Sequence, residues 1–192
     1  MASRFDDEIW ELVTEDPASP PAHLARFVTG LARVADALDV GCGDGRLTEL
    51  VPAERVTAAD VSAQALERAG KRLPEARLVE LDPDAPLPFG DAAFDLVLCV
   101  ETVEHVRDVQ LLLSEARRVL RPGGTLALTT PAHARATALV ALVRGWDRVF
   151  DPLTPHLRFF SGRSLSRLLG EMGFECRLLE RRHGTLLATA TR

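Results

Sequence analysis

The chain has 192 residues, of which 46 % are hydrophobic and 27 % are charged, and it carries a formal net charge of −5. This balance is typical of a folded globular protein and excludes a disordered chain. The length predicts a single domain over residues 1–192, because two domains of ordinary size need a longer chain. Proteins that bind DNA or RNA along one face are normally basic, so nucleic acid is not the expected partner.

Cysteine usage and the N-terminal residues indicate the cellular compartment. Cys42, Cys99 and Cys176 are odd in number and form no CxxC pair, which argues against a disulfide framework and against a zinc site. The stretch MASRFDDEIWELVTED has no basic start followed by an apolar core, and the apolar runs of the chain are only of strand length. We therefore expect no secretory signal, no membrane span and a cytoplasmic location.

Residues 1–34 are predicted to form a helical cap. The first 16 residues make a weak amphipathic segment that includes Phe5, Ile9, Trp10 and Val13. Residues 20–33 have the apolar stripe of a helix, at the spacing expected for one buried face. This cap precedes the segment in which strands and helices alternate.

Residues 35–130 are predicted to form the ligand-binding core. Ser62 and Asp108 are the expected N-caps of two amphipathic helices, and the sequence PGG at 122–124 is the expected stop of the second. The glycine-rich stretch after the first strand continues into a helix-like pattern over 46–50. The expected strands are 36–40, 55–59, 76–81, 94–100 and 124–130, and the expected helices are 62–73 and 108–120.

Residues 131–192 are predicted to complete the domain with further helices and a terminal hairpin. They begin with a helical pattern, continue through DPLTPHLRFF, and end in a helix over 164–173 and an antiparallel hairpin made of 175–181 and 184–191.

Repeated strand, helix, strand units with short links imply a parallel, doubly wound α/β sheet with helices on both faces. Such sheets bind ligands at the carboxyl ends of their strands.

The stretch ALDVGCGDGRLTEL carries the main functional signal. Gly41, Gly43 and Gly45 have the spacing GxGxG, whereas a dinucleotide fingerprint has GxGxxG. Asp39 precedes the first glycine by two residues and would repel a pyrophosphate, but it suits a ligand with a cationic group. Asp60 ends the second predicted strand, where a carboxylate accepts hydrogen bonds from ribose hydroxyls. A ribose attached to a cationic group fits S-adenosylmethionine.

With these residues the chain resembles the class I S-adenosylmethionine-dependent methyltransferases, in particular the small-molecule group typified by ubiquinone and menaquinone biosynthesis enzymes. The resemblance covers roughly residues 35–190 and rests on LDVGCGDGRL, AADVS, LPFGDAAFDLVLCVETVEHV, RVLRPGGTLALTTP and FFSGRSLSRLLGEMGF. It implies a Rossmann-like sheet of seven strands, mostly parallel with the last strand antiparallel. It also implies that the cofactor is held by Asp39, Gly41, Cys42, Gly43, Gly45, Asp60, Val61, Asp82, Val100 and Glu101.

The choice of Asp82 follows from a departure from the family's pattern. The family often has an acid four residues before the leucine of LPF, near the adenine amino group, and here that position is Pro83. Asp82 and Asp84 flank it, and we take Asp82 as the adenine partner. Asp39 and the glycine loop are then expected at the methionine part, and Asp60 at the ribose.

The segment ETVEH follows the fourth predicted strand and is therefore expected beside the cofactor. In one interpretation His105 is a general base that takes a proton from a hydroxyl as the methyl group arrives. In a second, Glu101, Glu104 and His105 bind a divalent metal, and His156 or His133 would supply a further ligand. This interpretation follows from the pattern ExxEH, which resembles the metal-binding segment of the small-RNA 3′-terminal 2′-O-methyltransferases. In a third, Glu104 and His105 only orient the loop and cap the next helix.

The acceptor is expected between residues 131–160 and the N-terminal helices. Aromatic and arginine side chains of this segment either line an acceptor site or serve as ordinary core and surface residues; they are Trp146, Phe150, Phe159, Phe160, Arg135, Arg144, Arg148 and Arg158. The chain has no tyrosine and offers no evident base-stacking platform for RNA.

The sequence therefore predicts methyl transfer to a small-molecule acceptor, at oxygen, by a monomer or homodimer that converts S-adenosylmethionine into S-adenosylhomocysteine. Displacement at a sulfonium depends mainly on alignment and desolvation, so a strong base is not required. Two alternatives use the same cofactor: metal-assisted 2′-O-methylation of an RNA 3′ end, and a non-catalytic cofactor-binding subunit. A nicotinamide oxidoreductase is disfavoured by GxGxG and Asp39.

Overall fold

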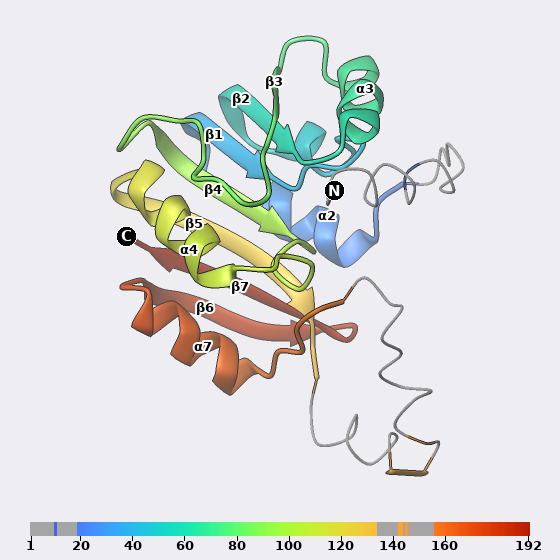
Figure 1. The fold of residues 1–192 in the computed structure, drawn as a ribbon, viewed down its shortest axis with the longest axis vertical. Helices are drawn as coiled ribbons and strands as arrows, with labels where there is room; N and C mark the ends of the chain where they lie inside the picture. The colour runs from blue at the N-terminus through green and yellow to red at the C-terminus, as the bar shows by residue number, and fades with distance from the viewer. Residues whose placement is uncertain (1–9, 11–18, 134–141, 144, 146–155) are drawn as a thin grey trace.

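Seven strands form one sheet in the order β3-β2-β1-β4-β5-β7-β6 (Figure 1). The computed structural model describes residue 10 and residues 19–133, 142–143, 145 and 156–192. All neighbouring strands pair in parallel except β7, which is antiparallel to both β5 and β6. The strands are β1 Val34–Val40, β2 Ala53–Asp60, β3 Arg77–Glu80, β4 Phe94–Val100, β5 Leu120–Pro131, β6 Glu175–Arg182 and β7 Thr185–Thr191. The predicted fold class is confirmed.

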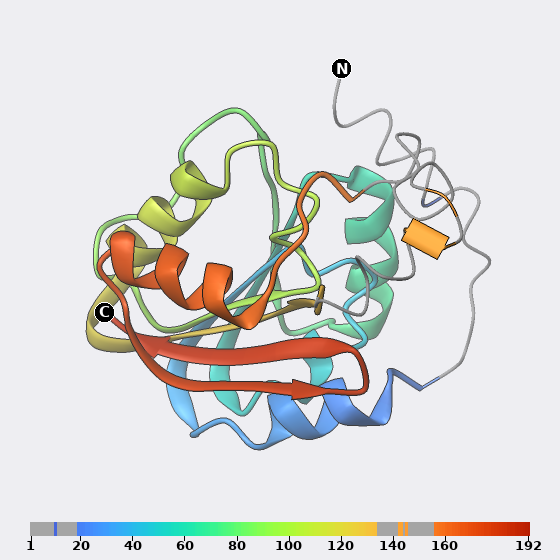
Figure 2. The same cartoon turned by 90° about the horizontal axis from the view of Figure 1, so that it is seen from below.

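Helices cover both faces of the sheet, because successive side chains of each strand point to opposite faces and both sets are apolar. Leu38 packs in the core under α4 (Val109–Val119) and α7 (Gly162–Glu171), whereas Ala37 packs under α2 (Ala22–Thr29). Ala58, which packs against α3 (Ala63–Arg72), lies opposite Asp39 and so shares the face of Ala37. Figure 2 shows α4 and α7 on one side of the β6–β7 hairpin and α2 on the other.

The expected caps begin the two core helices. The Ser62 side chain accepts a hydrogen bond from the Ala65 N–H at the start of α3, and Asp108 does the same for the Leu111 N–H at the start of α4. These bonds satisfy N–H groups that have no partner inside the helix. Each helix therefore begins immediately after its strand or loop, with its apolar stripe turned to the sheet.

Several expected element boundaries differ from those in the structure, and two of the differences have a local cause. The helix-like pattern over 46–50 forms only a 3₁₀ turn, Thr48–Leu50, because Pro52 follows at once and disfavours helical backbone at Val51. The second helix ends at Val119, before the PGG sequence, because Leu120 is already extended and pairs with Phe94. β5 therefore begins four residues earlier than expected.

Part of the predicted acceptor segment lies outside the described residues, including Arg135, Arg144, Trp146, Arg148 and Phe150, as do Phe5, Ile9 and Val13 of the N-terminal segment. Of the remaining aromatic residues, Phe160 is buried in the core, whereas Phe159 is exposed and its ring lies 4.9 Å from that of His133. Within the described ranges, no helix has the length and apolar character needed to cross a bilayer.

Candidate active site

A cavity of about 370 Å³ opens at the carboxyl edge of the sheet. Consecutive parallel strands contribute to its wall at the residues where they end or just beyond, and the N-terminal part of α4 closes the side away from them. Its wall includes Val40, Gly41, Asp60, Val61, Leu81, Asp82, Glu101, Leu111 and Leu112. A site of this size at this edge is typical of small-ligand binding in open α/β sheets.

The glycine loop between β1 and the 3₁₀ turn depends on its three glycines. Gly41, Gly43 and Gly45 all have positive φ, at 77°, 54° and 79°. A Cβ on Gly41 would lie 2.6 Å from the Thr102 side chain, and one on Gly45 would lie 2.7 Å from Leu73. The loop therefore excludes side chains at these positions for reasons of both backbone conformation and space.

Four N–H groups of this loop donate hydrogen bonds within the protein. Gly41 and Cys42 donate to the Ala59 carbonyl oxygen at 2.8 and 3.1 Å, Gly43 donates to Asp60, and Gly45 donates to the Cys42 carbonyl oxygen. In a loop that binds a pyrophosphate, such N–H groups instead point toward the anion. The hydrogen bonding thus agrees with the GxGxG spacing in disfavouring a dinucleotide.

Asp60 connects the glycine loop to α3. Its two carboxylate oxygens accept hydrogen bonds from the N–H groups of Gly43, at 2.8 Å, and Ser62, at 2.9 Å. The side chain is nearly buried, yet it lines the cavity. Each carboxylate oxygen has a second acceptor site, so Asp60 can also accept hydrogen bonds from a bound ligand.

Asp39 lies behind the loop and does not line the cavity. Its Oδ2 accepts a hydrogen bond from the Thr48 hydroxyl at 2.6 Å, while Oδ1 is buried and has no hydrogen-bond partner among the described residues. Burial, reinforced by the negative charge of Asp60, raises the pKa of Asp39 to about 6 against the lowering effect of Thr48. The fold therefore favours the protonated carboxyl group at this position.

The titration of Asp39 predicts a pH dependence of stability. Because the folded pKa of about 6 exceeds the ordinary value of 3.8, Asp39 favours folding at low pH and loses this contribution as pH rises through 6. We expect its contribution to the free energy of unfolding to fall by about 1 kcal/mol between pH 5 and pH 7. Urea unfolding of the wild type and of Asp39→Asn, both without ligand, gives their free energies of unfolding at each pH. The difference between the two free energies should fall by this amount from pH 5 to pH 7. A difference that does not change with pH would contradict the expected titration.

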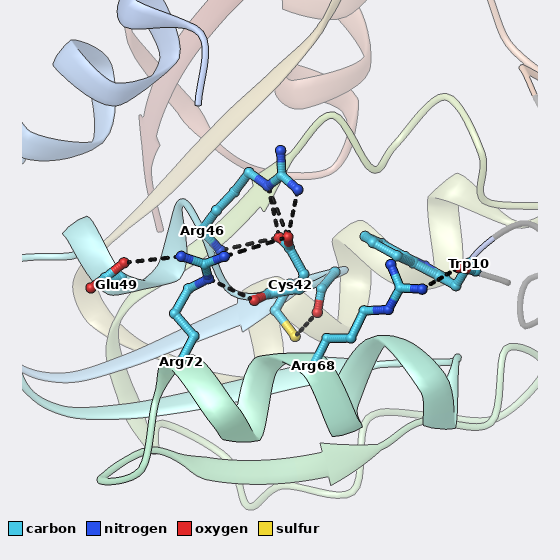
Figure 3. Close-up of polar contacts among 8 residues, drawn as sticks. Trp10, Cys42, Arg46, Glu49, Arg68 and Arg72 are labelled. Carbon is cyan, nitrogen blue, oxygen red and sulfur yellow. Dashed lines mark hydrogen bonds and ion pairs between the residues drawn. The ribbon is translucent and has the colours of Figure 1, made fainter. Parts of the chain in front are cut away.

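Asp44, the second acid of the glycine loop, is not part of the cavity wall. It forms ion pairs with Arg46, at 2.5 Å, and with Arg72 of α3, at 3.8 Å. Burial would raise the pKa of Asp44, but the hydrogen bonds from Arg46 outweigh it and lower the pKa. Figure 3 shows Arg46 and Arg72 gathered on one side of the loop. The role of Asp44 is therefore to fasten the loop to α3.

The ETVEH segment brings a buried carboxylate next to two imidazoles. Glu104 is 1 % exposed and neither of its carboxylate oxygens has a hydrogen-bond partner among the described residues. Burial raises the pKa of Glu104 to about 7. Its Oε1 lies 3.9 Å from His105 Nε2, and one ligand atom from each of Glu104, His105 and His156 lies within 4.8 Å of the others. The arrangement can accept a proton or a cation.

Glu101 is held apart from this group. It has positive φ, 53°, and its Oε1 accepts a hydrogen bond from the Thr129 hydroxyl at 2.7 Å. It lines the cavity, as does His105. Of the two predicted additional histidines, the structure places His156 rather than His133 with Glu104 and His105.

The structure divides the predicted cofactor residues into two groups. Those that line the cavity are Gly41, Gly43, Asp60, Val61, Asp82 and Glu101; those that lie behind it are Asp39, Cys42, Gly45 and Val100. The Cys42 side chain packs under α3, and Val100 belongs to the core under α2. Asp82 lines the cavity, whereas Asp84 forms an exposed ion pair with Arg107 at 3.1 Å.

Most of the other residues of the cavity wall were not identified from the sequence, and Thr102 and Trp10 are two of them. Thr102 lies against Gly41 and its hydroxyl donates to the carbonyl oxygens of Val40 and Val100. Its position directly after Glu101 was a signal that could have been used. Trp10 also lines the cavity, but it was identified only as part of an amphipathic stripe, and nothing in the local sequence links it to Gly43.

A seven-stranded sheet of this order, with a glycine loop after β1 and a carboxylate at the end of β2, defines a Rossmann-like nucleoside-binding fold. Residues 38–128 match a family described as methyltransferase domain. The chain is 35 % identical over 150 residues to a malonyl-[acyl-carrier protein] O-methyltransferase of Enterobacter lignolyticus, covering 74 % of this chain and 57 % of the relative. It is 36 % identical over 121 residues to a trans-aconitate 2-methyltransferase of Paracidovorax citrulli, covering 61 % and 46 %.

Solved structures show the same fold. A structure described as a putative methyltransferase from Bacillus halodurans superposes with a TM-score of 0.71 at 19 % identity, covering 89 % of this chain and 99 % of that one. Residues 38–128 are thus a methyltransferase domain, and the chain is similar in sequence to S-adenosylmethionine-dependent methyltransferases and shares the fold of solved methyltransferase structures. It spans about half the length of the curated relatives it matches.

Proposed function

We propose that the protein transfers the methyl group of S-adenosylmethionine to an oxygen atom of a small-molecule acceptor. One observation carries the proposal: the same cavity is lined by the glycine loop, Asp60 and His105. A cofactor and a proton acceptor would therefore share one site. The name of the Enterobacter relative, an O-methyltransferase, supports oxygen as the accepting atom.

The cavity wall supports a specific placement of the cofactor. We assign the methionine part to the backbone of Gly41, the ribose hydroxyls to Asp60 and the adenine amino group to Asp82, with Val61 providing apolar contact. Asp39 acts through the loop, because it holds Thr48 and does not reach the cavity. The mixture of apolar walls and a few carboxylates suits a nucleoside with a cationic side chain.

The reaction would be a direct displacement. The acceptor oxygen attacks the methyl carbon, the bond between sulfur and carbon breaks, and S-adenosylhomocysteine leaves as a neutral thioether. The proton of the acceptor hydroxyl passes to the imidazole of His105, which is partly exposed at the cavity wall. Alignment in the cavity and removal of water supply the rest of the rate enhancement.

Substitution of His105 tests this function. We expect His105→Ala to lower kcat by about 100-fold while leaving the affinity for S-adenosylmethionine unchanged, because only proton removal is lost. The matched control is His183→Asn, which changes a histidine of the β6–β7 turn outside the cavity wall. Production of S-adenosylhomocysteine with a panel of hydroxyl and carboxyl acceptors is the measurement. Cofactor binding without turnover of any acceptor would instead favour a non-catalytic binding subunit.

The group of Glu104, His105 and His156 favours a second candidate, metal-assisted methylation. The residues fit a divalent ion: two imidazoles and a carboxylate whose buried oxygens have no partner among the described residues. Such an ion would hold two adjacent oxygens of the acceptor and lower the pKa of the attacking hydroxyl. The acceptor would then be a vicinal diol, a class that includes catechols and the 3′ end of RNA.

Metal titration distinguishes the two candidates. If the second is correct, calorimetry of the chelator-treated protein with Mn²⁺ or Mg²⁺ should show one site, and Glu104→Gln and His156→Ala should each abolish it. Glu180→Gln, which alters a carboxylate paired with Arg182 on β6, is the control. Absence of metal binding together with full activity in chelator would exclude the metal mechanism and leave His105 as the base.

A further inference from the structure

Trp10 forms part of the cavity wall although it is distant in sequence from every other residue of the site. It lines the same cavity as Gly41, Gly43 and Asp60. Two atoms of its indole ring, Cζ2 and Cη2, lie 2.9 and 3.0 Å from the position that a Cβ on Gly43 would occupy. The indole thus packs directly on the glycine loop, in the space that the missing side chain leaves.

Arg68 of α3 holds Trp10 in this position. Its Nη2 donates a hydrogen bond to the Trp10 carbonyl oxygen at 2.6 Å, and its guanidinium carbon lies 5.6 Å from the centre of the indole ring. The second distance is that of a cation–π contact. Figure 3 shows Arg68 extending from α3 to Trp10, on the side of the loop away from Arg72. One side chain therefore fixes both the backbone and the ring.

The indole forms a wall of the cavity and leaves space for a ligand. The volume of about 370 Å³ is what remains with Trp10 in place, and it lies within the range of sites that enclose small ligands. A ligand can therefore bind while the ring stays on Gly43, and the ring then forms part of the wall around that ligand.

The part covered is the ribose. Gly43, on which the indole packs, donates its N–H to Asp60, the carboxylate to which we assign the ribose hydroxyls. We propose that Trp10 is a cofactor-binding residue that covers the nucleoside end of the cavity, and that Arg68 is its positioning residue. This inference rests on the proposed cofactor. It adds Trp10 to the site. It also assigns the Trp10 contact to the nucleoside, which S-adenosylmethionine and S-adenosylhomocysteine have in common.

Calorimetry with S-adenosylmethionine, S-adenosylhomocysteine and 5′-methylthioadenosine tests the assignment. We expect Trp10→Ala to raise the Kd of all three ligands by the same factor, about tenfold, because the lost contact is to the nucleoside. Trp10→Phe should restore most of the affinity. Arg68→Ala should give a smaller common loss, and Arg68→Lys should recover part of it by keeping the positive charge. Lys71→Ala, an exposed basic residue of the same helix, should have no effect.

The possible results separate this inference from the function on which it rests. Wild-type affinity in a Trp10→Ala variant whose circular dichroism spectrum is unchanged would overturn the assignment of Trp10 alone. A loss confined to S-adenosylmethionine would place the indole at the sulfonium and overturn its placement at the ribose. Failure of the wild-type protein to bind any of the three ligands would overturn the proposed function, and the assignment with it.

Discussion

Replacing Asp60 with alanine should weaken the binding of S-adenosylmethionine by at least about 100-fold. The substitution removes the proposed acceptor of the ribose hydroxyls and, at the same time, the acceptor of the Gly43 and Ser62 N–H groups. The buried Ser62 N–H and the part-buried Gly43 N–H then lose their partner, and the glycine loop loses one of its connections to α3. Calorimetric titration with S-adenosylmethionine measures the loss directly.

The conservative variant and a distant carboxylate provide the controls for Asp60. Asp60→Asn keeps one side-chain oxygen and should therefore lose less affinity than Asp60→Ala. Asp36→Asn alters a carboxylate of β1 that pairs with Arg55 and Arg121, away from the cavity. It should change stability without changing affinity. Equal affinities of the wild type and a folded Asp60→Ala variant would refute the role of Asp60 and require another placement of the ribose.

Gly41→Ala should reduce the free energy of unfolding by about 3 kcal/mol and abolish cofactor binding. The backbone at Gly41 has a φ of 77°, which costs an alanine about 1 kcal/mol. The new Cβ would also lie 2.6 Å from both Cγ2 and Oγ1 of Thr102, so either β4 or the loop must move. Urea unfolding gives the stability change, and calorimetry gives the change in affinity.

A double substitution separates the two causes at Gly41. Thr102→Ala removes both close atoms, so Gly41→Ala combined with Thr102→Ala should recover the part of the stability that is lost to overlap and retain the part lost to backbone strain. Gly90→Ala is the matched control, because no atom lies within 4 Å of its Cβ and its φ is not positive. If Gly41→Ala were no more destabilising than Gly90→Ala, close packing at Thr102 would not be the reason for this glycine.

Local sequence patterns predicted most of the sheet and its helices. The apolar run 94–100 matches β4 exactly in its bounds, and Ser62 and Asp108 cap α3 and α4 as expected. These features depend on residues close in sequence: alternation or helical spacing of apolar side chains, and a side-chain oxygen three residues before an N–H group. The spacing GxGxG and Asp60 likewise indicated the edge of the sheet at which the cavity lies.

Which side chains of the site lie next to one another could not be predicted in the same way. The sequence grouped Glu101, Glu104 and His105 and left the further histidine open between His156 and His133. The structure places His156 with Glu104 and His105 and leaves Glu101 hydrogen-bonded to Thr129. Asp39 was expected to meet the ligand, yet its side chain points behind the loop. Both outcomes depend on strand twist and loop conformation, which no local pattern specifies.

By itself, the sequence determined the α/β class, the order of most elements, the glycine loop and the family resemblance, because each is encoded within a few neighbouring residues or one βαβ unit. Only the tertiary structure decided which of those residues form the cavity wall. Trp10 meets Gly43, and His156 meets Glu104, because the sheet brings distant segments to one edge. Contacts between segments so far apart are fixed by packing of the whole domain, so they can be read from the folded chain alone.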